Sequence, residues 1–342
     1  MKNYNFCIAW NWEYDSDFVR LLEEACRARG LSLLQVTPQN LSEVLQALAN
    51  KELSFQVFFD RASDTDARFI TISQLVRPQP EPVSNTNLKF LSIFHYLGKL
   101  LRKSTPELAP IPQVYHINPL ELALHSWDKA LTHQAFKEAD IPTPDTIILP
   151  SYNEREDLPS IELSSLGPNF VIKPAAHRVG GEQEDVIFGA TTLEQVRYAR
   201  QRKPSDKYLL QRFMVPVQLD TRPAWFRVIY CSGQVYPCWW DTITHIYHPV
   251  TPAEETCYGL TPLRDIAAKV AGICGLQLFS TEIAKTQEGR FIAIDNVNDQ
   301  IDLRLKSKAM DGVPDDIVQN IAHRLVALVP ECCRVSPPCN PD

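Results

Sequence analysis

The first sixty residues alternate between apolar runs of strand length and segments with helical spacing, and this alternation most constrains the fold. The apolar runs cover residues 5–10, 31–36 and 55–59. The helical spacing occurs at Phe18, Leu21, Leu22 and Ala25, and again over residues 41–48. Gly30 stands where a helix C-cap is expected. Strands that alternate with helices predict a parallel sheet with right-handed crossovers, so we expect a small α/β domain over residues 1–115.

A different order of elements follows this domain. Two proline-rich stretches, residues 78–82 and 105–112, flank a predicted helix over residues 88–101. Further helices are predicted over residues 120–127, 129–139, 193–200, 263–274 and 315–328. Strands are predicted over residues 146–149, 170–174, 186–188, 208–211, 225–230, 234–240, 278–285 and 289–294. The last four strands read as two antiparallel hairpins, so we expect an α+β part over residues 116–215 and 216–330, then a flexible tail over 331–342.

Charge and cysteine usage restrict the class of protein. The formal net charge is -7 and the pI about 5.7, which argues against general nucleic-acid binding because that needs a basic surface. The nine cysteines include no C-x-x-C pair, and neither a secretory signal nor a membrane-spanning apolar run is evident. We therefore expect a cytoplasmic protein with reduced cysteines that binds neither nucleic acid nor membrane.

Lys173 is the first candidate for chemistry. It stands in the apolar strand Phe170-Val-Ile-Lys-Pro, and Gly180 and Gly181 begin a turn seven residues later. A lysine before a glycine turn suits phosphate binding, since backbone N–H groups can approach oxygen atoms closely there. The alternative is a strand lysine beside an ordinary hairpin loop, and three acids in this loop fit that alternative.

A cluster of acids and amides is the second candidate. Glu282 lies on one strand of the last predicted hairpin, while Asp295, Asn296 and Asn298 end the other. Alternate residues of a strand share a face, so Asn296 and Asn298 point together and Asp295 points away unless a bulge intervenes. Carboxylate and amide oxygens suit Mg²⁺, which also binds substrate phosphates. The alternative is a polar turn, in which Asn and Asp are common.

Two arginines and two histidines are further candidates. Arg227 stands in an apolar strand, and its planar guanidinium suits a phosphate or carboxylate, although a structural ion pair would also explain it. Arg304 suits either a substrate carboxylate or the surface. His245 and His248 lie in an aromatic stretch without a third zinc ligand nearby, so we interpret them as pocket lining or surface. The sequence contains neither a P-loop nor a G-x-S-x-G nucleophile elbow.

Five motifs, in this order along the chain, resemble those of the ATP-grasp superfamily. Together they span about half of the chain. They are Asp128-Lys129, Ile141-Pro-Thr-Pro-Asp-Thr, Val171-Ile-Lys-Pro with its glycine loop, Leu209-Leu-Gln-Arg-Phe-Met and Phe291-Ile-Ala-Ile-Asp-Asn-Val-Asn-Asp. The resemblance is to carboxylate–amine ligases of the glutathione synthetase, D-alanine–D-alanine ligase and alpha-glutamate ligase type. It implies a pre-ATP-grasp-like domain over residues 1–115, then a small lobe over 116–215 and a large lobe over 216–330.

The resemblance also implies roles for single residues. Those expected to contact the nucleotide are Lys129, Lys173, Gly180, Gly181, Gln211, Arg212, Met214 and Gln218. The candidate magnesium ligands are Glu282, Asp295, Asn296 and Asn298. In this scheme the two lysines hold phosphates, Gly180 and Gly181 belong to a lid loop, and Gln211 meets adenine. Lys173 and Arg227 are the expected catalytic residues, with Arg227 steadying the transferred phosphoryl group or the acyl phosphate.

The sequence departs from the family pattern in three places. Gln211 replaces the acid of the hinge strand, and the lid loop has fewer glycines than usual. The metal strand matches either as Asn296-x-Asn298, without a carboxylate, or as Asp295 with a bulge before Asn298. We favour Asp295, since an anion opposes Mg²⁺ better than an amide does.

The activity that the resemblance implies is ligation that depends on ATP and Mg²⁺. The γ-phosphate would activate a carboxylate as an acyl phosphate, which an amine or similar nucleophile then attacks. The expected partners are a small-molecule carboxylate and an amine, and a homodimer is the family expectation. Two alternatives keep the same fold: a small-molecule kinase, and a nucleotide-binding protein without turnover.

Overall fold

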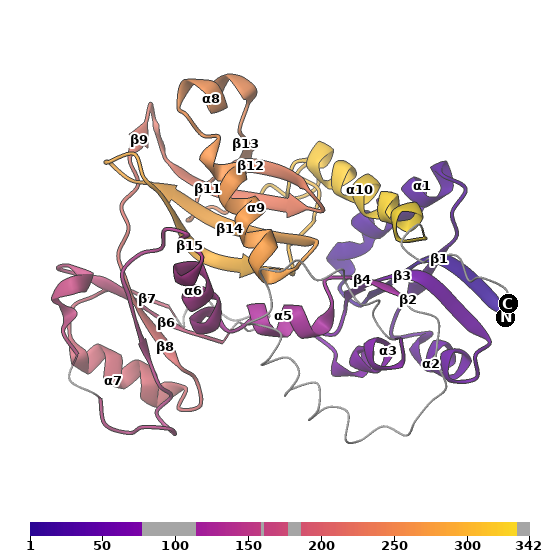
Figure 1. Cartoon of the computed structure of the whole chain (residues 1–342), viewed down its shortest axis with the longest axis horizontal. Helices are drawn as coiled ribbons and strands as arrows, with labels where there is room; N and C mark the ends of the chain where they lie inside the picture. The colour runs from indigo at the N-terminus through magenta and orange to yellow at the C-terminus, as the bar shows by residue number, and fades with distance from the viewer. Residues whose placement is uncertain (77–113, 159–160, 177–185, 334–342) are drawn as a thin grey trace, which may run out of the picture. The chain divides into compact units, whose positions relative to one another are not determined.

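The computed structural model describes residues 1–76, 114–158, 161–176 and 186–333 (Figure 1). The chain divides into two compact units: unit 1 combines Met1–Glu121 with Asp302–Asp342, and unit 2 is Leu122–Ile301. Residues 302–333 therefore belong to the same unit as residues 1–76, which the sequence pattern did not predict. The predicted helix over residues 88–101 lies outside the described residues, as do Gly180 and Gly181. The division at residue 215 stays a prediction.

Unit 1 is built on a parallel sheet with the strand order β2-β1-β3-β4. The strands are β1 (Lys2–Trp10), β2 (Leu33–Val36), β3 (Leu53–Arg61) and β4 (Tyr115–Ile117). The helices are α1 (Ser16–Ala28), α2 (Leu41–Ala49), α3 (Ile70–Leu75) and α10 (Asp315–Cys333). The predicted parallel α/β sheet is thus confirmed. α10 continues past its predicted end at residue 328, and residues 334–342 of the predicted tail lie outside the described part of the chain.

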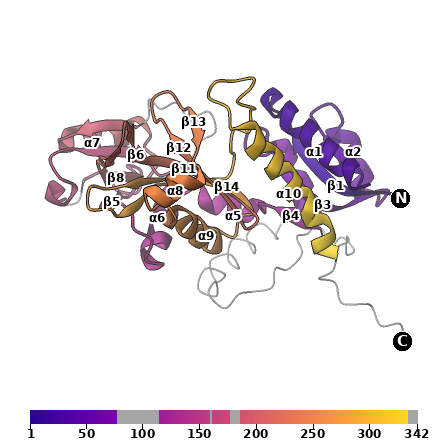
Figure 2. The same ribbon diagram turned by 90° about the horizontal axis from the view of Figure 1, so that it is seen from above.

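Helices cover both faces of this sheet. α1 and α10 lie side by side on one face, where the rings of Phe18 and Phe59 meet edge-on with centroids 6.4 Å apart (Figure 2). α2 and α3 cover the other face, with a core that includes Leu41, Phe58 and Ile72. A parallel sheet that is buried on both faces needs nearly continuous apolar strands, which explains why β1 and β3 were recognisable in the sequence.

A buried ion pair joins the end of β3 to the start of α1. The Nε and Nη2 groups of Arg61 donate to the two carboxylate oxygens of Asp15, at 3.0 and 2.7 Å. The side chains of Arg61 and Asp15 are only 3% and 1% exposed. Breaking such a pair is costly, because removal of one partner leaves the other charge buried without compensation.

Unit 2 contains two main antiparallel sheets, which we call the small sheet and the large sheet. The small sheet has the order β5-β8-β6-β7: β5 (Thr146–Leu149), β8 (Tyr208–Arg212), β6 (Phe170–Pro174) and β7 (Ile187–Ala190). The large sheet has the order β13-β12-β11-β14-β15: β13 (Tyr247–Pro249), β12 (Gln234–Trp240), β11 (Trp225–Cys231), β14 (Leu278–Lys285) and β15 (Phe291–Asn298). A short ribbon pairs β9 (Gln218–Leu219) with β10 (Arg222–Pro223). The helices are α5 (Leu120–Ser126), whose first two residues belong to unit 1, α6 (Lys129–Glu138), α7 (Leu193–Arg202), α8 (Pro252–Cys257) and α9 (Pro262–Cys274).

Each sheet of unit 2 has one face in an apolar core. Val196 of α7 packs with Phe170, Ile172 and Leu210 of the small sheet. Residues of α6 and α9, among them Phe136, pack with the apolar face of the large sheet. Because side chains alternate along a strand, the polar residues between these core positions all lie on the opposite face of their sheet. We use the name open face for the side of each sheet that points away from its apolar core, whether or not its side chains are exposed to solvent.

Candidate functional site

Two lysines from separate elements of unit 2 converge on one carboxylate. The Nζ group of Lys173, on β6, donates to the carbonyl oxygen of Ile294 at 3.2 Å and lies 3.7 Å from Oδ1 of Asp295. The Nζ group of Lys129, at the start of α6, lies 2.9 Å from the same oxygen. Lysines taken from two different sequence motifs therefore meet at a residue taken from a third.

The local sequence around Lys129 explains its position. Asp128 caps α6, since its Oδ1 accepts hydrogen bonds from the backbone N–H groups of Ala130 and Leu131 at 2.9 and 3.1 Å. The backbone N–H of Lys129 donates to the carbonyl oxygen of Ala175 at 2.8 Å. The cap and this bond tie the first turn of α6 to the end of β6, which carries Lys173.

The strand β15 is bulged, and the bulge decides which residues face the site. Asp295 is opposite Glu282 and Asn298 is opposite Ser280, with an extra residue on β15 between the two pairs. Directly opposed residues of antiparallel strands point to the same face of the sheet. Asp295 and Asn298 therefore share the open face of the large sheet with Glu282. This is the arrangement that the sequence allowed only if a bulge intervened.

Arg227 and Glu282 occupy the same open face on adjacent strands. They are directly opposed in the register of β11 and β14, and the Nη1 group of Arg227 lies 3.5 Å from Oε1 of Glu282. The Nε group of Arg227 donates to Oγ of Ser280 at 3.2 Å, and Nε1 of Trp225 donates to Oε2 of Glu282 at 3.0 Å. Arg227, Glu282 and Asp295 thus form one cross-strand row in which a cation is followed by two carboxylates.

The predicted magnesium ligands offer a donor set of suitable chemistry. Glu282 and Asp295 supply carboxylates on one row of the open face. The Oδ1 atom of Asn298 is buried, and within the described chain it has no hydrogen-bond partner. No group of three or more His, Cys, Asp or Glu side chains in the described residues is arranged to hold a metal by itself. Two carboxylates and an amide instead fit Mg²⁺ shared with substrate phosphates, which is how this ion is usually held.

Of the residues expected near adenine, Gln211 lies on β8 of the small sheet. Thr146, Gln211 and Val171 form one cross-strand row on its open face, and Ile148, Leu209 and Lys173 form the next. Gln211 is buried and its Nε2 donates to Oγ1 of Thr146 at 3.4 Å. Strand alternation therefore adds Val171, Ile148 and Leu209 to the face that carries Lys173, although these residues were not among the predicted ones.

The remaining residues of this group lie beyond or at the end of β8. Arg212 is exposed and its Nη1 pairs with Oδ2 of Asp145 at 3.1 Å. Met214 is half-buried in the segment after β8, and Gln218 is exposed on β9. The predicted contacts of Met214 and Gln218 with the nucleotide stay predictions.

Burial controls the electrostatics of the site. It lowers the pKa of Lys173 to about 8, a shift that Asp295 opposes and that Lys129 adds to. Burial also lowers the pKa of His133, which lies one turn after Lys129 on α6, to about 4, with Lys173 and Lys137 adding to the shift. The site therefore holds a cation that is easily deprotonated beside a neutral imidazole, and added negative charge would favour the protonated form of Lys173.

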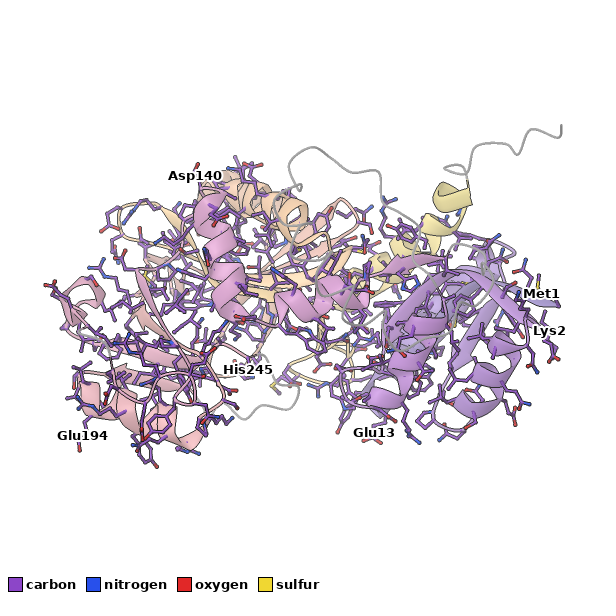
Figure 3. The ribbon with its side chains drawn as sticks, turned by 60° about the horizontal axis from the view of Figure 1, so that its bottom comes forward. Met1, Lys2, Glu13, Asp140, Glu194 and His245 are labelled. Atoms are coloured by element: carbon purple, nitrogen blue, oxygen red, sulfur yellow. The ribbon has the colours of Figure 1, made fainter. Side chains whose placement is uncertain are left out.

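The two histidines and Arg304 have different surroundings. The His245 imidazole, labelled in Figure 3, stacks parallel to the Trp240 ring with centroids 5.3 Å apart, whereas His248 is exposed. Arg304 belongs to unit 1, where it pairs with Asp302 and Asp311 at 2.6 and 2.8 Å. His245 thus lines the open face of the large sheet.

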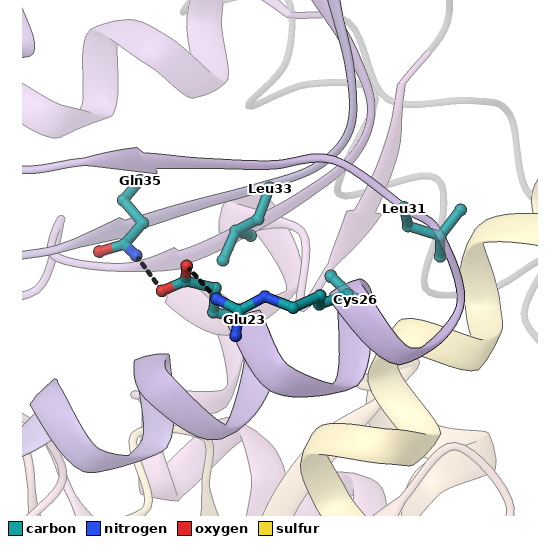
Figure 4. Close-up of a pocket in the computed structure, with 6 residues that line it drawn as sticks. Glu23, Cys26, Leu31, Leu33 and Gln35 are labelled. Carbon is teal, nitrogen blue, oxygen red and sulfur yellow. Dashed lines mark hydrogen bonds and ion pairs between the residues drawn. The ribbon is translucent and has the colours of Figure 1, made fainter.

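A separate pocket of about 210 Å³ lies in unit 1 between α1 and β2 (Figure 4). The side chain of Glu23 in this pocket bonds to Arg27 and Gln35 at 3.1 and 3.4 Å. None of the residues predicted to bind a nucleotide or metal lines it. Among the described residues, no helix has both the length and the apolar character needed to cross a membrane.

Comparisons with known proteins place this geometry in context. No protein-family model matches the chain, and no curated protein matches it. A RimK domain protein ATP-grasp from Sphaerobacter thermophilus DSM 20745 matches with a TM-score of 0.55 and 18% identity, covering 93% of this chain and 98% of its own. The D-alanine–D-alanine ligase from Bacillus anthracis, in complex with ATP, matches with a TM-score of 0.55 and 11% identity over 97% and 98% of the two chains.

A third similar structure contains a peptide. It is the ATP-grasp ligase PsnB in complex with the precursor peptide PsnA2 and AMPPNP, with a TM-score of 0.53, 12% identity and coverage of 97% of this chain and 98% of its own. At these identities the likeness concerns the fold alone.

Proposed function

From the premise that the chain has the ATP-grasp fold, we propose that it binds Mg-ATP in unit 2 and uses it to join a carboxylate to an amine. One observation carries the proposal: Lys129 and Lys173 converge on Asp295, in the same cross-strand row as Glu282 and Arg227. A site for a triphosphate that carries a metal ion requires cations for the phosphate oxygens and, close to them, a carboxylate for the metal ion.

Nucleotide binding would exchange the partners within this cluster. In the structure, the ammonium groups of Lys129 and Lys173 pair with the carboxylate of Asp295. Phosphate oxygens would take over the two ammonium groups, and the carboxylates of Asp295 and Glu282 with the amide oxygen of Asn298 would then hold Mg²⁺. The ion, when bound, would neutralise charge on the phosphates. The lysine ammonium groups would thus bind the phosphates, and the carboxylates would bind the metal ion.

Arg227 would act on the phosphoryl group as it moves to the substrate carboxylate. Its guanidinium is fixed between strands at one end of the charged row, and it remains protonated at any physiological pH. The carboxylate would attack the γ-phosphorus, ADP would leave, and an amine would then displace phosphate from the acyl carbon. Positioning and charge neutralisation suffice for these steps, and no covalent nucleophile from the protein is needed.

Lys173→Ala tests the site. We expect the affinity for Mg-AMPPNP, measured by titration calorimetry, to fall about 10- to 100-fold, since a charged hydrogen bond contributes about 1.5–3 kcal/mol. Lys137→Ala is the matched control, because Lys137 is an exposed lysine on α6. Unchanged affinity in Lys173→Ala would refute the assignment of the site.

The reaction itself is tested by the products formed from ATP. Release of ADP and phosphate that requires both an added carboxylate and an added amine would support ligation. The panel of carboxylates should include amino acids and peptides, since the similar structures comprise a D-alanine–D-alanine ligase and a complex with a precursor peptide. Stable phosphorylation of an alcohol would instead identify a kinase, and tight binding without turnover would identify a nucleotide-binding protein.

A further inference from the structure

We propose that Trp240 and His245 are positioning residues that hold the guanidinium of Arg227 in the orientation needed for phosphoryl transfer. The inference rests on the proposed function, because it assumes that Arg227 meets the transferred group. It adds two residues of an aromatic stretch that the reaction scheme above does not use.

The guanidinium of Arg227 lies over an aromatic ring as well as beside polar groups. Its Cζ atom is 4.8 Å from the centroid of the Trp240 ring. Two of its polar contacts on the large sheet are with Ser280 at 3.2 Å and with Glu282 at 3.5 Å. Hydrogen bonds from the nitrogens act within the plane of the guanidinium, whereas stacking on an indole restrains the plane itself.

Trp240 is itself held from several directions. Its side chain is buried, with 7% of the residue exposed. The imidazole of His245 is parallel to the indole within 1°, and the ring of Tyr247 lies 4.5 Å away between centroids. A ring packed in this way cannot rotate freely, so it can transmit a fixed orientation to Arg227.

The register of the large sheet explains why these side chains meet. Arg227 is opposite Cys238, and Trp240, two residues further along β12, points to the same open face. Trp240 is in turn opposite Tyr247 on β13. The aromatic side chains therefore continue the face that carries Arg227 and Glu282 onto the next two strands.

The loop between β12 and β13 places His245 over the indole at a conformational cost. His245 has φ +58°, a left-handed conformation that residues with a side chain seldom adopt. Asp241 stabilises the loop, because its Oδ1 accepts from the N–H groups of Ile243 and Thr244 at 2.8 and 3.1 Å. Its carbonyl oxygen accepts from the N–H of His245 at 2.8 Å. Several bonds thus maintain a strained residue where its ring stacks.

The aromatic contact has an advantage over the ion pair in the proposed reaction. When Mg-ATP binds, the Glu282 carboxylate would coordinate Mg²⁺, so its ion pair with Arg227 would weaken in the state in which Arg227 acts on the phosphoryl group. The contact of Trp240 with Arg227 does not involve the Glu282 carboxylate and would remain. Loss of the indole would therefore affect the step in which Arg227 acts more than the binding of the nucleotide.

The experiment compares two ligands on the full chain: Mg-ADP, and Mg-ADP with aluminium fluoride as a mimic of the transferred phosphoryl group. We expect Trp240→Leu to bind Mg-ADP within about twofold of the wild type and to lose about tenfold of the added affinity that aluminium fluoride confers. Trp240→Phe, which keeps an aromatic face, should recover most of that loss. His245→Asn tolerates the left-handed backbone and removes the ring, so it should show a partial loss, with exposed His248→Asn as its control.

A double-mutant cycle of Trp240 and Arg227 shows whether Trp240 acts through Arg227 or independently of it. If Trp240 acts through Arg227, Trp240→Leu should cause no further loss in an Arg227→Ala background. The inference is overturned if the two losses multiply, if Trp240→Phe is as poor as Trp240→Leu, or if Mg-ADP alone is weakened equally. Failure of the wild type to bind Mg-ADP would overturn the proposed function and this inference with it.

Discussion

At the scale of single residues, the site is dominated by a buried cation. Lys173 is 8% exposed, and burial is the main cause of its lowered pKa. The Asp295 carboxylate partly compensates the buried charge, and the phosphates of a nucleotide would compensate it further. Ligand binding and protonation of Lys173 should therefore be linked.

This linkage predicts that nucleotide affinity depends on pH. Lys173 is charged below its pKa of about 8 and neutral above it, so affinity for Mg-AMPPNP should fall as pH rises through about 8. Lys173→Arg keeps its charge throughout this range and should give a flatter profile. Titration calorimetry between roughly pH 7 and 9 measures both profiles. Identical slopes in the two proteins would show that another group is responsible.

Trp225 provides a second test at this scale, because its indole N–H holds Oε2 of Glu282 at 3.0 Å. Trp225→Phe keeps the ring and removes this donor. We expect the Mg²⁺ concentration needed for half-maximal ATP binding to rise about tenfold, since partners of metal ligands typically contribute 10- to 100-fold. Exposed Trp12→Phe, in unit 1, is the control. An unchanged Mg²⁺ requirement would contradict the role of Glu282 as a ligand.

Much of the residue-level cluster was predictable from the sequence. Lys129, Lys173 and Asp295 were predicted from separate motifs, and the structure brings them together. Trp225 and Trp240 were not among the predicted site residues. Their alternation with Arg227 along paired strands would have indicated the open face, but only once the register of β11 and β12 was known.

At the scale of elements, most helices and strands were predicted, whereas a bulge in β15 entered the prediction only as the condition under which Asp295 shares a face with Asn298. The register of β15 shifts on either side of Glu282, and this places Asp295 on the open face. A bulge depends on how two strands pair, so one strand's sequence does not reveal it. The short strands β4 and β13 were missed for a related reason: three residues are too few to show alternation.

The N-cap of α6 gives a prediction at this scale. Asp128→Ala should cost about 1 kcal/mol of stability and also weaken Mg-AMPPNP binding, because the cap fixes the turn that carries Lys129. Asp128→Asn should retain most of both. Thr192→Ala removes the capping box of α7 and should lower stability by a similar amount without changing affinity. Thermal unfolding and calorimetry measure the two effects. Equal affinity in the two alanine variants would argue against the coupling.

At the scale of the whole molecule, the expected ATP-grasp fold is confirmed, and so is the parallel sheet of unit 1. The helical pattern of residues 315–328 was also recognised in the sequence. Its place in the fold was not, because a helical pattern shows which residues are buried but not which sheet they cover. Contacts over some three hundred residues of sequence, such as Lys308 with Asp17 at 2.5 Å, leave no local signature.

The two units allow stability and ligand binding to be separated. Arg61→Ala leaves Asp15 buried without a partner and should lower the free energy of unfolding by about 3–5 kcal/mol. Nucleotide affinity of the folded protein should not change, since all described residues proposed to bind it lie in Leu122–Ile301. Arg20→Ala, which removes a pair with both side chains about half exposed, should change stability by less than about 0.5 kcal/mol. Denaturant titration measures both variants, and a small effect of Arg61→Ala would refute the argument.

The return of α10 to unit 1 has a consequence for biosynthesis. The ribosome makes β1, α1, β2 and β3 first, but α10, which shares one face of their sheet with α1, comes after Leu122–Ile301. At about 5–20 residues per second, that intervening segment takes roughly 10 to 40 seconds to synthesise. Throughout this interval the nascent chain carries an apolar sheet that lacks one of its covering helices. We therefore expect chaperones that bind nascent chains to engage this protein early and to release it only after α10 has emerged.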